Sequence, residues 1–281
     1  MVWKKDRIKP TQPYLVFDTE NFFQQVYLQE GISHFYTFQV GKDKPLRLVP
    51  DGCIDLFFAY GRDGMSCHAC GTKLTYSCDE EVKEGEVFGV RFMPGTHPEL
   101  LQVTMRELLE RKIPIEDILT GDGAWLERME QETDFRRRVQ VFLDAYMNAE
   151  MCKVQPFGKK ELVCSVKQMV YDSDGKVKVS KMQEQTGYSE RYINKVFLEE
   201  MGFSPKTFCK IIQFQHALEF LNYGAPGKMT DAAVSFGYYD EPHFINDFKK
   251  YAGMTPRKYL RLVQGQDYKN KIQKTREDKG V

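Results

Sequence analysis

The feature that most constrains the fold is a pattern that occurs twice in the second half of the chain. Residues 179–205 and 230–261 each predict a helix, a glycine-containing turn, a second helix, and a Gly-x-(Ser/Thr)-Pro segment. Gly187 and Gly237 stand where the first helix of each copy ends, because the chain reversal there needs a positive φ that glycine adopts without steric cost. Each copy therefore predicts a helix-turn-helix unit.

The residues around and between the copies support a rigid pair of units. In the second copy, Phe244, Phe248 and Tyr251 recur at helical spacing, and Asp240 supplies an N-cap oxygen. Residues 205–222 predict one long connecting helix whose broad apolar face packs against both units. Helix-turn-helix units can insert a helix into the major groove of DNA, and successive major-groove faces of B-DNA recur about every 34 Å. A fixed separation between the two units would let both meet such faces at once.

Charge divides the chain into two halves. There are 40 Lys and Arg and 40 Asp and Glu, but residues 159–281 hold 21 of the former and 15 of the latter. That half therefore carries a net charge of +6, and the first 158 residues carry −6. Basic side chains release condensed counterions when they contact phosphates, so the second half fits a surface that faces nucleic acid.

The second half of the chain resembles the DNA-binding domain of AraC/XylS-type transcription regulators. The resemblance rests on the paired units, the Gly-aromatic-Ser turn, the long helix between the units, and the motif Phe-x-x-x-x-Gly-x-(Ser/Thr)-Pro in both copies. The resemblance covers about residues 160–263. It implies a sequence-specific transcription regulator whose partners are double-stranded DNA and RNA polymerase. Activation is favoured over repression on family grounds, and a homodimer stays an open alternative.

Helix geometry and the resemblance together select side chains that face DNA. In the first recognition helix, Tyr192, Ile193 and Val196 are expected to face the core. The family's base-contacting positions, carried over one by one, fall on Arg191, Asn194 and Lys195. Arginine can grip a guanine edge and asparagine an adenine edge, each worth roughly 1–3 kcal/mol of discrimination. The first unit is therefore expected to carry most of the specificity.

The second recognition helix is expected to read bases less well. Its corresponding positions are Glu241, Pro242 and Asn246; a glutamate repels phosphates and a proline donates nothing. This unit should contribute mainly phosphate anchoring. The expected phosphate contacts, taking both units together, are Ser189, His243, Lys249 and Lys250.

The first half of the chain predicts a β-rich lobe. Aromatic and β-branched residues fill 34–40, 53–60 and 87–92, which are predicted strands separated by Gly- and Pro-containing turns. Helical periodicity follows and predicts helices that close the lobe, at 100–109, 115–119 and 135–146. The predicted fold class is therefore α+β, with this lobe joined to an all-α domain of two helix-turn-helix units and a long helix.

The segments LVPDGCIDLFFAYG and GVRFMPG resemble the sensory domain of one AraC-type subgroup, whose relatives have cupin-like barrels. This implies a domain that binds a small-molecule effector, with a purely structural or dimerising role as the alternative. The predicted boundaries are a domain at 1–147, a linker at 148–160, the DNA-binding domain at 161–263 and a flexible tail at 264–281.

One group of residues points to a different chemistry: Cys67, His68, Cys70 and Cys78. A Cys-x-x-Cys pair with a nearby histidine and a third cysteine can bind zinc or hold a redox-active thiol. No second Cys-x-x-Cys follows, so buried or idle thiols are the competing interpretation. A metal-sensing or redox-sensing regulator is therefore the second hypothesis.

Other classes of protein are disfavoured. No apolar run approaches the ~18 residues that span a membrane, and the N-terminus lacks the apolar core of a signal peptide. These observations predict a cytoplasmic protein whose seven cysteines are reduced. No catalytic triad, phosphate loop or paired-carboxylate motif stands out, so a DNA-repair enzyme fused to a DNA-binding domain is the weakest alternative. No catalytic residue and no cofactor is assigned.

Overall fold

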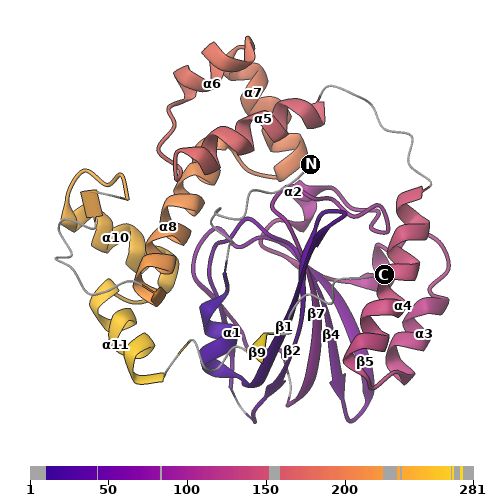
Figure 1. Ribbon diagram of the computed structural model, residues 1–281. Helices are drawn as coiled ribbons and strands as arrows, with labels where there is room; N and C mark the ends of the chain where they lie inside the picture. The colour runs from indigo at the N-terminus through magenta and orange to yellow at the C-terminus, as the bar shows by residue number, and fades with distance from the viewer. Residues whose placement is uncertain are drawn as a thin grey trace.

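The protein folds into a β-rich lobe and a helical lobe, as the computed structural model shows (Figure 1). The structure describes residues 11–42, 44–82, 84–151, 159–223, 233–234, 236–266, 268 and 273–274. The predicted α+β class is confirmed: strands form the first lobe, helices close it, and two helix-turn-helix units joined by one long helix form the second.

A seven-stranded sheet forms the centre of the β-rich lobe, with strand order β8-β5-β4-β7-β2-β1-β9. Neighbouring strands are antiparallel except for β1 and β9, which are parallel. The strands are β1 (Glu20–Gln29), β2 (Ile32–Val40), β4 (Asp55–Gly61), β5 (Gly64–Cys70), β7 (Gly85–Phe92), β8 (Lys112–Pro114) and β9 (Gln273–Lys274). A separate two-stranded sheet pairs β3 (Leu46–Leu48) with β6 (Ser77–Asp79). The strands predicted at 34–40, 53–60 and 87–92 are confirmed as β2, β4 and β7.

The helices of this lobe differ in part from those predicted. They are α1 (Pro13–Asp18), α2 (Met105–Leu108), the 3-10 turn Ile115–Asp117, α3 (Ala124–Gln131) and α4 (Phe135–Met151). The helix predicted at 135–146 is confirmed within α4, whereas the one predicted at 100–109 is wrong apart from the single turn α2. The reason is that the backbone of Leu100 and Gln102 bonds to the 118–120 segment, and a capping box at Thr104 starts the helix only there.

The two faces of the sheet are buried differently. Because side chains alternate along a strand, Phe58 and Phe88 face α3 and α4, whereas Phe57 and Val87 face the opposite side. On that opposite side, the same hydrophobic cluster continues into α1 and the helical lobe, as far as Tyr259. Figure 1 shows the two coverings, α3 and α4 on one side and α1 with the helical lobe on the other.

The helical lobe contains both units. Its helices are α5 (Lys159–Asp172), α6 (Val179–Thr186), α7 (Glu190–Met201), α8 (Pro205–Tyr223), α10 (Glu241–Ala252) and α11 (Pro256–Gln266). The long helix predicted at 205–222 is confirmed as α8. The first helix of the second unit is predicted from residue 230 to Gly237, and of this stretch residues 230–232 and 235 lie outside the described residues; Ala233 and Phe236 are buried.

The predicted boundaries fall near these elements. Helix α4 continues to Met151 and α5 begins at Lys159, and the predicted linker residues 152–158 lie outside the described residues. Helix α11 runs to Gln266, three residues past the predicted domain end, and Tyr268 is buried with its ring 5.3 Å from that of Phe17. Within the described part of the chain, no helix is both long and apolar enough to cross a bilayer.

The lobes are joined by specific polar contacts as well as by packing. The Tyr14 hydroxyl of α1 donates to the carbonyl of Ala252 at the end of α10. On α8, the Gln215 amide donates to the carbonyl of Pro50 at 2.7 Å and accepts from the backbone N–H of Thr11 at 2.8 Å. The long connecting helix is therefore fastened to the β-rich lobe.

Candidate nucleic-acid interface

The two recognition helices, α7 and α10, begin in the same way. Gly187 and Gly237 adopt positive φ angles of 73° and 84°, as the turns require. The Ser189 hydroxyl then accepts from the backbone N–H of Tyr192 at 3.3 Å, and the Asp240 carboxylate accepts from that of His243 at 2.8 Å. Each helix therefore has a side-chain cap at its N-terminus, the end whose dipole and remaining N–H groups attract phosphates.

The predicted base readers of the first unit are accessible. Arg191 and Lys195 are exposed, Asn194 is partly exposed, and the core side of α7 is formed by residues such as Ile193 and Val196. The Lys195 ammonium lies 3.9 Å from the carboxylate of Glu199. An ion pair this exposed is worth at most about 1 kcal/mol, so it leaves Lys195 able to exchange partners. The roles of these three side chains remain predictions.

The expectation that Tyr192 faces the core is wrong. Its side chain is 40% exposed and stacks on Tyr188, with ring centroids 5.0 Å apart. The buried stripe of α7 runs through Ile193, Val196 and Phe197, and Tyr192 lies just beyond its edge, about 40° around the helix from Val196. Tyr192 therefore lies at the border of the core stripe, on the surface beside the predicted base readers.

The second unit presents an exposed tyrosine at the matching place. Tyr239 stands directly before the cap Asp240 and is 91% exposed, just as Tyr188 stands directly before the cap Ser189. Sequence reasoning did not single out either tyrosine, although both immediately precede a predicted cap. Each recognition helix therefore begins beside an accessible aromatic ring.

The predicted contacts on α10 are distributed along its length. Glu241 is partly exposed, and Pro242, His243, Asn246, Lys249 and Lys250 are exposed. The His243 imidazole lies 3.5 Å from the Asp247 carboxylate, which also lies 3.2 Å from the Lys210 ammonium of α8. Near the end of the helix, the Lys250 carbonyl accepts from the backbone N–H of Tyr76. The two lysines thus lie where α10 meets the β-rich lobe, and their contact with phosphates remains a prediction.

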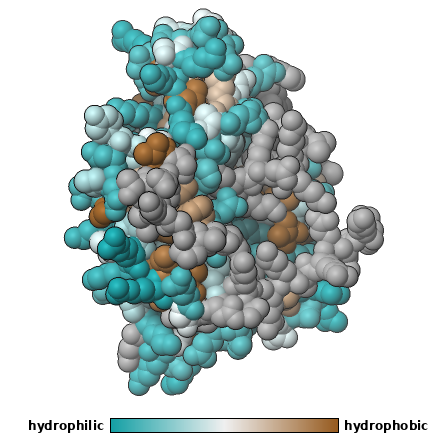
Figure 2. Space-filling view, turned by 60° about the vertical axis from the view of Figure 1, so that its left-hand side comes forward, coloured by the Kyte–Doolittle hydropathy of each residue, from teal (hydrophilic) through white to brown (hydrophobic). Residues whose placement is uncertain are grey.

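The side of the molecule turned forward in Figure 2 is mostly hydrophilic where the residues are described. The hydrophobic residues visible there form separate spots instead of one continuous patch. A surface of this kind suits a charged, hydrated partner better than an apolar one.

The four candidate metal ligands are not brought together. Cys67 and Cys70 are three residues apart on β5, so they face opposite sides of the sheet, and Cys67 lies in the core under α4. His68 lies on the same side as Cys70, and Cys78 is exposed on β6 with its Sγ 3.1 Å from the Tyr76 hydroxyl. Within the described ranges, no three His, Cys, Asp or Glu side chains are placed to hold a metal ion.

The buried thiols are also poorly suited to redox sensing. Burial raises the pKa of the Cys67 thiol well above its usual value and that of the Cys70 thiol to about 12. Both therefore stay protonated at neutral pH, and the protonated thiol is neither the nucleophile nor the metal-binding form.

Comparisons with known proteins agree with this geometry. Residues 182–262 match the family model of a helix-turn-helix domain, and residues 25–114 match a domain of unknown function, DUF6597. An uncharacterized HTH-type transcriptional regulator of Staphylococcus aureus (strain MSSA476) is 28% identical over 101 residues, 36% of this chain. That match spans only 13% of the relative's length.

Solved structures provide two further comparisons. ToxT from Vibrio cholerae is 12% identical, with 89% of this chain and 96% of that one covered and a TM-score of 0.41. A probable AraC family transcriptional regulator from Rhodopseudomonas palustris CGA009 is 30% identical, with a TM-score of 0.34; the match covers 37% of this chain and 97% of that one. Because the 30% identity extends over nearly the whole of that relative, the protein belongs to the AraC family of transcriptional regulators.

Proposed function

We propose that the protein is a sequence-specific DNA-binding transcription regulator whose β-rich lobe responds to a small molecule. The observation that carries the DNA-binding part is the pair of recognition helices, each with a capped N-terminus, exposed polar side chains and an adjacent exposed tyrosine. Helix α8 connects the two units as one continuous helix. Such a pair can enter two successive major-groove segments on one face of DNA.

The two units are proposed to make different kinds of contact with DNA, the first mainly to bases and the second mainly to phosphates. Arg191 and Asn194 of α7 are the chief base readers, with Lys195 beside them, because guanidinium and amide groups match purine edges. Helix α10 serves mainly as an anchor: His243, Lys249 and Lys250 contact phosphates, which position the protein without specifying sequence. Glu241 and Asn246 make the smaller contribution to base reading.

The proposed sensing part follows from the packing of the lobes. The β-rich lobe shares a hydrophobic cluster with the second unit and touches the first through α2, where a Cβ added to Gly202 would lie 2.7 Å from the Met105 carbonyl oxygen. A ligand that shifts the β-rich lobe would therefore change how the recognition helices are held. The division proposed is an effector or dimerisation domain at 1–147 and a DNA-binding domain at 161–263, with RNA polymerase as the further partner.

Selection of genomic fragments by the purified protein at near-physiological salt, followed by footprinting, tests this function. The expected footprint covers two adjacent major-groove segments, about 34 Å apart, on one face of the duplex. Binding that depends on salt but not on sequence, both with and without added cell extract, would contradict the proposal. Running both conditions separates a missing effector from a wrong function.

A further inference from the structure

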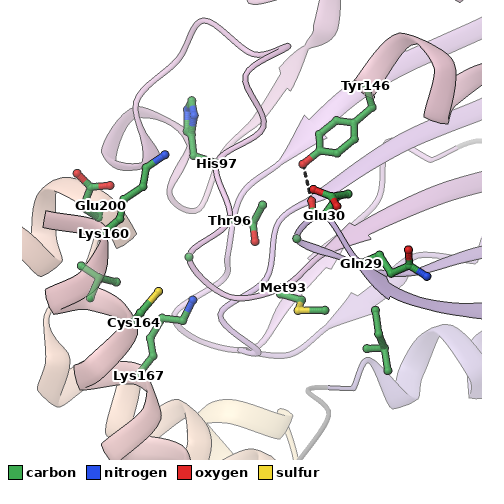
Figure 3. Close-up of a pocket in the computed structure, with 14 residues that line it drawn as sticks. Gln29, Glu30, Met93, Thr96, His97, Tyr146, Lys160, Cys164, Lys167 and Glu200 are labelled. Atoms are coloured by element: carbon green, nitrogen blue, oxygen red, sulfur yellow. Dashed lines mark hydrogen bonds between the residues drawn. The ribbon is translucent and has the colours of Figure 1, made fainter. Parts of the chain in front are cut away.

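A pocket of about 530 Å³ lies where the two lobes meet (Figure 3). One wall comes from the β-rich lobe: the turn between β1 and β2, the loop 93–97 and Tyr146 of α4. The other comes from the helical lobe, chiefly α5, with Glu200 of α7. A volume of this size accommodates a small organic molecule.

Lys167 of α5 places a positively charged side chain in the wall of this pocket. Figure 3 shows it reaching from α5 toward the loop of Met93, and its ammonium donates to the Pro94 carbonyl at 2.6 Å. Within the described part of the chain, no carboxylate forms an ion pair with it. Burial lowers the pKa of this lysine, because the charged form loses hydration there. The ammonium has three donors, so two remain for a ligand.

The position of Lys167 is tightly set by the neighbouring loop. Gly95 has a positive φ of 76°, and a Cβ added to it would lie 3.1 Å from the Lys167 nitrogen and 2.4 Å from the Met201 sulfur. The loop can therefore approach α5 and α7 this closely only with glycine at that position. The ammonium is held at the junction of the lobes and does not swing freely in solvent.

The other charged groups of the pocket do not compensate Lys167. Lys160 and Glu200 are on the helical wall and contribute opposite charges. Glu30 is exposed and contributes its backbone carbonyl, which accepts from the Tyr146 hydroxyl at 2.7 Å. The His97 ring nitrogen is engaged with the Val103 carbonyl. Lys167 is therefore the group at which an added negative charge would be stabilised most.

We infer that this pocket binds a small organic anion, with its anionic oxygens on the Lys167 ammonium and its apolar body against Leu28, Met93 and Val163. The ligand touches both lobes, since Lys167 and Val163 belong to α5 whereas Leu28 and Met93 belong to the β-rich lobe. Helix α5 packs on α7 through the cluster that includes Val163 and Ile193. The role of the bound anion as a signal for transcription rests on the proposed function, whereas the binding of the anion to the pocket does not.

The test uses matched probes on the full chain. Benzoate and phenylphosphonate present a carboxylate and a phosphonate on the same ring, and benzamide is the uncharged counterpart of benzoate. We expect an anion at about ten times its dissociation constant to raise the unfolding temperature by about 3 °C at constant ionic strength, because ligand binding stabilises the folded state. Lys167→Met should abolish the shift and Lys167→Arg should retain it, as should Lys181→Met, which removes an exposed lysine outside the pocket.

Each outcome decides the inference. A shift with benzoate alone assigns the pocket to carboxylates, and one with phenylphosphonate alone assigns it to phosphate-like groups. No shift with either anion, an equal shift with benzamide, or an undiminished shift in Lys167→Met would overturn the inference. These measurements contain no DNA, so they test the pocket independently of the proposed function. If the protein bound these anions but had no specific DNA sites, the proposed function would be refuted and the pocket would stand.

Discussion

The two helix-turn-helix units have the same local construction but different surroundings. The first unit has a core of its own, in which all the buried residues come from the helical lobe, among them Met182, Ile193 and Phe208. Among the described residues, the buried side chains of the second unit share one cluster with the β-rich lobe: Phe244 and Phe248 belong to the cluster that continues through α1 to the sheet. The first unit therefore has a core largely independent of the β-rich lobe, whereas the second unit shares its core with that lobe.

This difference has a consequence for regulation. A change in the β-rich lobe reaches the second unit through a continuous hydrophobic core, whose close packing transmits small displacements. It reaches the first unit through the contact of α2 with α7, through the pocket beside α5, and through the partly buried Leu74 and Leu109, which pack against the core of that unit. The unit proposed to read bases less well thus shares its core with the β-rich lobe, whereas the unit proposed to read them better has a core of its own.

The largest effect is expected from removing the aromatic ring that joins α1 to the second unit. Tyr14 is fully buried, its ring lies 6.2 Å from that of Tyr259, and its hydroxyl donates to Ala252. Tyr14→Ala should lower the free energy of unfolding by about 3–5 kcal/mol, as measured by urea denaturation, because a large cavity is left in a shared core.

Tyr14→Phe is the matched control, since it keeps the ring and removes only the hydrogen bond. Its expected cost is about 1 kcal/mol. If Tyr14→Ala cost no more than Tyr14→Phe, the packing of α1 would contribute little, and the second unit would be as independent of the β-rich lobe as the first.

The next largest effect concerns base reading by the first unit. Arg191→Ala should weaken binding to the cognate site by about 1–3 kcal/mol, roughly 5-fold to 150-fold, because a guanine edge loses its bidentate partner. Asn246→Ala, the corresponding test in the second unit, should cost less. Electrophoretic titration against cognate and random duplexes measures both, and equal losses of Arg191→Ala on the two duplexes would remove its assignment as a base reader.

The sequence alone predicted those features of the two units that depend on residues close together in the chain. Glycine turns, caps and Gly-x-(Ser/Thr)-Pro segments lie within a few residues of one another, so both units, and α8 between them, could be located. The strands β2, β4 and β7 were found for the same reason, because each is an apolar run between turns. The side chains that face DNA needed the family resemblance as well.

What could not be predicted depends on contacts between distant residues. The bond from Tyr14 to Ala252 joins residues 238 apart, and no local pattern indicates it. The proximity of Cys67 to Cys70 in sequence suggested a shared site, but a strand turns residues three apart to opposite faces. The pocket at Lys167 likewise exists only because two lobes meet there.

A smaller effect is expected at the anchoring end of the second unit. Replacing Lys249 and Lys250 together by alanine should weaken binding to all duplexes alike, and the slope of log affinity against log salt should fall by about 2, one per lost phosphate contact. Lys44→Ala, which removes an exposed lysine of the β-rich lobe, should leave the slope unchanged. An unchanged slope in the double variant would show that these lysines do not meet phosphates.

The smallest effect on stability, and the sharpest contrast with Tyr14, is expected at Tyr192. Because Tyr192 is exposed and touches mainly Tyr188, Tyr192→Ala should change the free energy of unfolding by no more than about 0.5 kcal/mol. If the tyrosine pair faces DNA beside Arg191, the same variant should nevertheless lower affinity for the cognate site. A loss of stability near that of Tyr14→Ala would place Tyr192 in a core after all, whereas unchanged stability with unchanged affinity would exclude the pair from the DNA interface.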